Sequence, residues 1–183
     1  MTTKITSASP LIYLGNCKDS EQVANTISTK LVAGFVSGNS KAATEIIDWV
    51  CSCPQEISID YIGDIVIELN VTFDDITFED IVVPEPMIEE ARKLRGRFKD
   101  LFFEGWIDKP KLANSFSIDA LGALMELVYI DNAADWDEDM EKLIRKVPEF
   151  KDDIINFVIE FSHKGDVPVP YDTINKLQAI TTN

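Results

Sequence analysis

Hydrophobic residues recur every third or fourth position through most of this chain, the spacing that puts them on one face of an α-helix. Between Asp19 and Gly38 the residues at this spacing are Val23, Ile27, Leu31 and Phe35. The same criterion, combined with capping residues and with breaks at proline and glycine, predicts seven helices. Their ranges are 19–38, 40–53, 86–104, 117–128, 135–147, 148–164 and 172–177.

Residues 57–83 have a different pattern. Thirteen of these 27 residues are β-branched, a composition that fits a pleated, half-buried surface. Apolar residues occupy every second position from Ile65 to Phe73, with Val66, Glu68, Asn70 and Thr72 between them, and Gly63 is unfavourable inside a helix. The pattern therefore predicts a small antiparallel β-meander near residues 57–83. The competing interpretation is one helix with an apolar face made of Ile62, Ile65, Val66 and Leu69.

Together these elements predict a mostly α protein of the α+β class, with about seven helices and one small meander. At 183 residues the chain fits one domain, residues 1–183. A sub-division is also open, into a helical hairpin plus meander at 1–83 and a helical part at 84–183. We find no signal segment and no apolar stretch near the roughly 18 residues of a membrane span, so we expect a cytoplasmic protein.

The chain is strongly acidic, with a net charge of −15 from 32 acidic and 17 basic residues. Such a charge repels nucleic acid and anionic lipid and attracts basic proteins. One acidic group exceeds the one or two carboxylates that a turn needs: Asp74, Asp75, Glu79 and Asp80. A second group lies where a helix dipole already favours carboxylates: Asp135, Asp137 and Asp139. Both groups are candidate contacts for a protein partner.

Basic residues concentrate in one predicted helix, at Arg92, Lys93, Arg95, Arg97 and Lys99. Three interpretations of this cluster are open. It can be the solvated face of an amphipathic helix, paired with neighbouring glutamates. It can be a groove for an acidic or phosphorylated partner. It can also dock internally, because residues 1–83 and 112–183 each carry −8 while residues 84–111 carry +1. The solvated face is the interpretation that we favour.

A dense aromatic segment follows at the end of that helix, Phe102-Phe103-Glu104-Gly105-Trp106. Phe103 and Trp106 cannot both share the inward face with Phe98 and Phe102. An exposed aromatic side chain is a typical interface anchor, so both residues are candidate partner contacts. The more common alternative is that such residues seal the core against the next loop.

The candidate metal-binding segments do not have the residue spacing that known metal sites require. The three cysteines, Cys17, Cys51 and Cys53, lack the C-x₂₋₄-C spacing of zinc loops. The segment after Asp135 begins like an EF-hand loop, but Met140 stands where the turn needs glycine and Lys146 where the bidentate glutamate belongs. The sequence therefore predicts no metal site.

Catalytic and cofactor motifs are missing as well. The single histidine, His163, lies in the last turn of a predicted helix, where the helix dipole favours a cation. Asp60, Asp64 and Glu68 would share a face, as a metal-dependent hydrolase needs, only if residues 57–83 were helical. No phosphate-binding glycine loop or nucleophile elbow occurs. We therefore assign no catalytic residue and expect no cofactor.

Three classes of function remain. The favoured hypothesis is a non-enzymatic acidic factor that binds a basic protein, of the inhibitor, immunity, anti-defence or nucleic-acid-mimic type. The first alternative is a phage-type assembly chaperone or a structural or virion component, with contacts through Phe103, Trp106 and an extended segment at Val167–Pro170. The second is a hydrolase with a carboxylate-bound metal. Homo-oligomers are compatible with all three.

Overall fold

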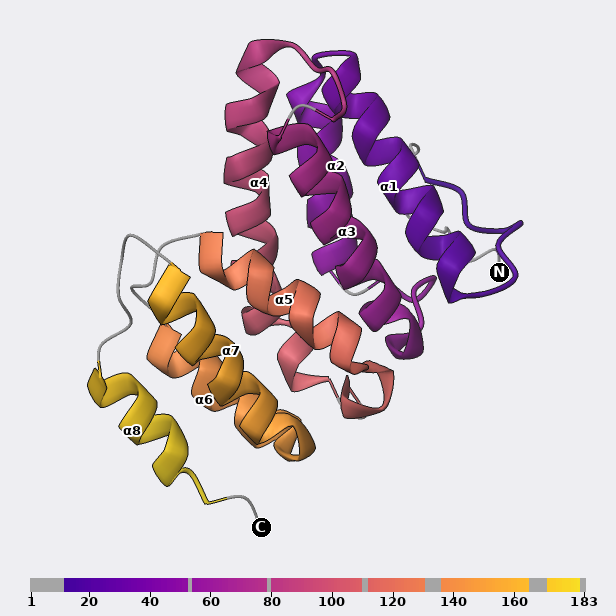
Figure 1. Ribbon diagram of the computed structural model, residues 1–183. Coiled ribbons are helices and arrows are strands. Elements are labelled where there is room, and N and C mark those ends of the chain that lie inside the picture. The colour runs from indigo at the N-terminus through magenta and orange to yellow at the C-terminus, as the bar shows by residue number, and fades with distance from the viewer. Residues whose placement is uncertain are drawn as a thin grey trace.

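The computed structural model describes residues 12–52, 54–78, 80–109, 112–130, 136–164 and 171–181. Eight α-helices lie in these ranges: α1 Ser20–Val36, α2 Ser40–Cys51, α3 Ile62–Thr77, α4 Glu85–Glu104, α5 Ile118–Ile130, α6 Trp136–Lys146, α7 Lys151–Lys164 and α8 Tyr171–Ala179. Short 3₁₀ helices are η1 Ile59–Tyr61, η2 Trp106–Asp108, η3 Leu112–Ser115 and η5 Pro148–Phe150. In Figure 1, α1 to α4 form one group, α6 to α8 another, and α5 lies between them. The mostly α prediction is confirmed.

The predicted β-meander is wrong. Residues 62–77 form a single helix, and the described parts of the chain contain no β-strand. Six large apolar residues of this segment fall on one helical face, and that face is fully buried: Ile62, Ile65, Val66, Leu69, Phe73 and Ile76. Burial of six large side chains outweighs the low helix propensity of β-branched residues, which is below about 1 kcal/mol each. The competing helical interpretation was therefore the correct one.

Helix α3 is the centre of the fold because it packs against α1, α4 and α5. A buried hydrogen bond of 2.6 Å joins the hydroxyls of Ser28 on α1 and Thr72 on α3. On the side of α5, the Asn70 amide donates to the Glu126 carboxylate at 2.7 Å. Gly63 meets η3 so closely that a Cβ there would overlap the carbonyl oxygen of Ser115. Glycine is needed at position 63 because the backbone of α3 passes so close to the backbone of η3.

The helical hairpin predicted from the sequence is confirmed. Asp19 caps α1, where its carboxylate accepts a hydrogen bond from the Gln22 amide at 2.9 Å. Gly38 turns the chain into α2 with a φ of 70°, a conformation that favours glycine. Its Cα faces Pro84, at the start of α4. The α1–α2 turn and the α3–α4 connection therefore lie at the same end of the molecule (Figure 1).

Helices α6, α7 and α8 pack on one another and, through α5, on the rest of the chain. Lys151 donates from Nζ to the carbonyl oxygens of Gln178 and Ile180, and so ties the end of α8 to the start of α7. The buried apolar side chains from Ile12 to Leu177 form one core cluster. No described helix is both long enough and apolar enough to cross a lipid bilayer.

Candidate functional site

The basic cluster of α4 is partly an internal structure. Arg95 is only 1% exposed, and its guanidinium donates to Asp74 Oδ1 at 2.6 Å and to Asn70 Oδ1 at 2.9 Å. A third, longer bond of 3.4 Å reaches the carbonyl oxygen of Glu126 on α5. A buried charge requires such partners because its desolvation is costly. Internal docking is therefore confirmed for Arg95.

The other cations of α4 also have acidic neighbours. The Arg97 side chain donates to Asp48 on α2 at 2.8 Å, and this bond raises the pKa of the guanidinium above its usual value. Lys99 is buried and lies 3.0 Å from the Asp100 carboxylate. The two remaining cations are exposed: Arg92 pairs with exposed Glu89, and Lys93 pairs with Glu90, which is half-buried. Exposed pairs of this kind contribute little stability, as the solvated-face interpretation predicts.

The described members of the first candidate acidic group, Asp74, Asp75 and Asp80, differ in whether they have a cationic partner. Asp74 is 32% exposed and is the ion-pair partner of Arg95, so it neutralises an internal charge. Asp75, the next residue, is half-buried, and Asp80 is exposed. Neither has a cationic partner in the described part of the chain. Glu79 lies outside the described residues. Asp75 and Asp80 are thus the members that remain available to a partner.

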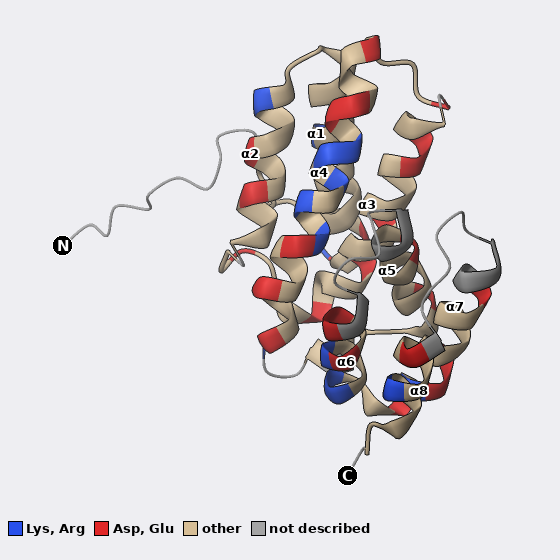
Figure 2. Cartoon of the chain, turned by 90° about the vertical axis from the view of Figure 1, so that its left-hand side faces the viewer, with Lys and Arg blue, Asp and Glu red and all other residues tan. Residues whose placement is uncertain are grey.

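Helix α3 presents a mixed acidic and apolar stripe on the side away from the core. We call this stripe the outer face of α3; it consists of Asp64, Ile67, Glu68, Val71, Asp75 and the C-cap residue Phe78, and Ile67 at its edge is partly buried against the core. Val71 is 47% exposed and Phe78 is 68% exposed. Figure 2 shows only acidic and uncharged positions along α3, in contrast to the basic positions that gather on α4.

No described cation neutralises the carboxylates of this face. Helix α3 contains no lysine or arginine. Among the described residues, Asp64, Glu68 and Asp75 form no ion pair, and only Asp74 at the edge of the face does so. The face thus combines three uncompensated negative charges with exposed apolar side chains.

The outer face continues into the α3–α4 connection. Val82 is 85% exposed, the largest exposed fraction among the large apolar residues described. It borders a groove of about 340 Å³ with Ile81, Val83, Glu85 and Ile88. This volume is at the low end of the roughly 300–1,000 Å³ typical of ligand pockets, so the groove suits one protruding side chain better than a large ligand.

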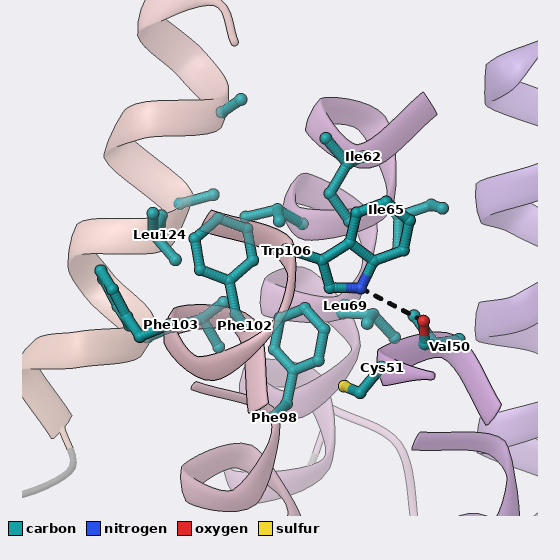
Figure 3. Close-up of a cluster of buried hydrophobic side chains, with 14 of the residues drawn as sticks. Val50, Cys51, Ile62, Ile65, Leu69, Phe98, Phe102, Phe103, Trp106 and Leu124 are labelled. Atoms are coloured by element: carbon teal, nitrogen blue, oxygen red, sulfur yellow. Dashed lines mark hydrogen bonds between the residues drawn. The ribbon is translucent and has the colours of Figure 1, made fainter. Parts of the chain in front are cut away.

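The aromatic candidates lie in the interior. Trp106 is 2% exposed, and its indole Nε1 donates to the carbonyl oxygen of Val50 at 3.2 Å (Figure 3). Phe103 is also buried, in edge-to-face contact with Phe102. Both side chains therefore seal the core, which is the alternative that the sequence offered. In this structure neither is available as an interface anchor.

The second candidate acidic group gives no exposed carboxylate that the structure describes. Asp139 is buried and borders a pocket with Glu138 and Lys142. Asp137 belongs to the first turn of α6, but its side chain is not among those described. Asp135 lies outside the described residues, as does the segment Val167–Pro170.

The carboxylates proposed for a hydrolase are only partly brought together. Residues 62–77 are helical, so Asp64 and Glu68 do share a face, whereas Asp60 lies in η1. In the ranges that the structure covers, no group of three His, Cys, Asp or Glu residues is arranged to hold a metal ion. The side chain of His163 is not among those described.

Sequence reasoning missed the apolar members of the site. Val71 and Phe78 were assigned to a β-meander, where their exposure could not be judged. The signal that could have found them is helical period: both lie opposite the buried positions Ile65, Leu69 and Phe73. Comparison with protein-family models, with curated proteins and with solved structures finds no match to this chain.

Proposed function

We propose that this chain is a non-enzymatic acidic factor that binds a basic protein, of the inhibitor, immunity, anti-defence or nucleic-acid-mimic type. The observation that carries the proposal is the outer face of α3. Its carboxylates, Asp64, Glu68 and Asp75, have no ion pair among the described residues, and exposed Val71 and Phe78 lie beside them. Uncompensated charge next to apolar surface is suited to protein recognition.

The two kinds of side chain have separate tasks in binding. Surface carboxylates attract a basic partner over distance, and so raise the rate of association and select against acidic partners. Apolar side chains that become buried supply most of the affinity after contact.

The assembly alternative rests on weaker support. Its aromatic anchors, Phe103 and Trp106, are buried, and the extended segment that it needs at 167–170 is outside the described residues. A basic partner also fits the net charge of −15 better than another acidic subunit does. We therefore give the acidic binder as the function that the geometry supports best.

Affinity capture at increasing salt tests this proposal. The full chain is immobilised, exposed to an extract of its source organism, and washed between about 50 and 300 mM NaCl, a range over which exposed charges become screened. The specific partner is expected to be basic and to be released as salt rises. A partner that stays bound equally well across this range would contradict the proposal.

Matched variants locate the binding surface. The test variant carries Asp75→Asn and Asp80→Asn. The control carries Glu104→Gln, at the C-terminal end of α4, and Asp108→Asn, in the following η2; both of these acids are exposed. Both change the net charge by two. Capture is expected to fall for the test variant and to persist for the control. Equal losses would show that only total charge matters, which would remove the α3 region from the proposal.

A further inference from the structure

We propose that the outer face of α3 binds an amphipathic helix of the partner, in which a row of basic residues runs beside a row of apolar residues. The inference rests on the proposed function and specifies its partner. It follows from the order of side chains on α3, from the limits of the exposed face and from its charge.

The outer face consists of two parallel rows. The apolar row is made of the exposed residues Val71 and Phe78 and of Ile67, which is partly buried against the core; the acidic row is Asp64, Glu68 and Asp75. Each row advances by four and then by seven residues, and the acidic row lies three residues earlier throughout. At 3.6 residues per turn, the six positions fall within about 100° of arc and extend over about 21 Å. The rows therefore run side by side along the helix.

Two hydrogen bonds fix the edges of this face. Thr72 is buried on one side by its bond to Ser28 of α1, and Asn70 is buried on the other by its bond to Glu126 of α5. Val71 lies between these two residues and is the one of the three that is exposed. The face is thus a strip one helix wide, bounded by α1 and α5.

The shape of the strip favours a helix as the occupant. A helix presents two neighbouring rows of side chains at spacings of three and four residues, which pack against matching rows on a second helix. An extended strand presents a single row on each face, with a period of two residues, and it leaves one row of α3 uncovered. Recognition of an amphipathic helix through anchors at i, i+4 and i+7 is a common mode of peptide binding.

Charge selects the partner and excludes a second copy of this chain. A copy docked on the same face would bring three more carboxylates against Asp64, Glu68 and Asp75, and like charges at a contact oppose binding. A helix with lysine or arginine next to its apolar row pairs with all three. We therefore assign the occupant as a basic amphipathic helix from a different protein.

Synthetic peptides test the inference without knowledge of the natural partner. The probe is a peptide of about 18 residues, long enough as a helix to cover the strip, with leucine and lysine in adjacent rows at helical spacing. One control peptide has the same composition in scrambled order, and a second has a central proline that breaks the helix. Binding to the full-length chain is measured by fluorescence anisotropy, and helix formation by circular dichroism.

The expected result is at least about tenfold tighter binding of the patterned peptide than of either control, equivalent to about 1.4 kcal/mol. A chain with Val71→Ser and Phe78→Ser should lose that preference, whereas a chain with Val36→Ser, another exposed valine, should keep it. Circular dichroism of each variant confirms that it is folded.

Three outcomes would overturn the inference. Equal binding of the scrambled peptide would show that charge alone is recognised; the salt-dependent capture of a basic protein would then still decide the proposed function separately. Self-association of the chain, detected by sedimentation and abolished by Phe78→Ser, would show that a second copy covers this face. Absence of both peptide binding and salt-dependent capture would reject the two proposals together.

Discussion

Helices α3 and α4 follow one another in the chain and pack together, but their charged residues differ in whether the fold gives them partners of opposite charge. Helix α4 carries five cations between positions 92 and 99, and each lies near a carboxylate. The charged residues of helix α3 are all acidic, and three of them have no ion pair among the described residues. The comparison teaches that a run of charge in a sequence does not indicate a binding surface. What matters is the charge that the fold leaves uncompensated.

The largest expected effect is on the free energy of unfolding, and it distinguishes the buried face of α3 from its outer face. Phe73 is fully buried against Phe35, so Phe73→Ala should lower the free energy of unfolding by about 4 kcal/mol. Phe78 is mostly exposed, so Phe78→Ala should change it by less than about 0.5 kcal/mol. Urea denaturation of both variants measures the difference. Comparable losses would mean that Phe78 belongs to the core and that the outer face is misassigned.

The second test compares two arginines of α4. Arg95→Met should cost about 3 kcal/mol, because it leaves Asp74 and Asn70 without their buried donor. Arg97 is exposed together with Asp48, so Arg97→Met should cost less than about 0.5 kcal/mol. Chemical denaturation gives both values. A loss at Arg97 equal to that at Arg95 would contradict the division of the basic cluster into internal and solvated members.

A smaller effect distinguishes two adjacent acids. Asp74→Asn should destabilise the fold by about 2 kcal/mol, because it removes the carboxylate that balances buried Arg95. Asp75→Asn should be neutral or slightly stabilising, by about 0.3 kcal/mol, because Asp75 has no ion pair in the described residues and lies near the negative end of the helix dipole. Thermal unfolding of the two variants at low salt compares them. The reverse order would show that Asp75 has a structural partner.

The smallest effect is that of salt on the unmodified chain. Screening weakens the repulsion among carboxylates, so the melting temperature should rise by about 2–4 °C between about 20 and 300 mM NaCl. The rise should be smaller in a chain with Glu68→Gln and Asp75→Asn, which removes part of that repulsion. Differential scanning calorimetry measures both. A melting temperature that falls with salt would indicate that ion pairs outweigh the repulsion.

Local signals made much of the fold predictable. The capping pair Asp19 and Gln22 marked the start of α1, and Gly38 marked its end. Seven of the eight described helices were expected within a few residues of their bounds, because their apolar spacing, caps and breaks agree. Such signals depend on residues close together in the chain, and they can therefore be evaluated without the fold.

Helix α3 could not be predicted in this way because its local and tertiary preferences conflict. Its β-branched residues favour a strand, and Gly63 opposes a helix in isolation. Contacts with α1, α4 and α5, which come from distant parts of the chain, decide the outcome. The outer face was missed for the same reason, because the helical period places Val71 and Phe78 opposite the buried residues only once residues 62–77 are known to be a helix.

The net charge was a poor guide to the acidic site. Asp74 and Asp75 are adjacent in the sequence and chemically identical, yet only Asp74 reaches Arg95. That distinction depends on a residue 21 positions away and on the packing angle between two helices. No pattern within the segment 74–80 contains this information.

Gly63 limits how this sequence can diverge during evolution. Its neighbour is the backbone carbonyl of Ser115, and a backbone atom cannot be shortened by a compensating substitution, so descendants with this crossing should retain glycine there. Val71 and Phe78 have no such internal constraint and are free to drift in a chain without a partner. If relatives retain apolar residues at both positions as strictly as they retain Gly63, that retention would indicate a conserved interaction.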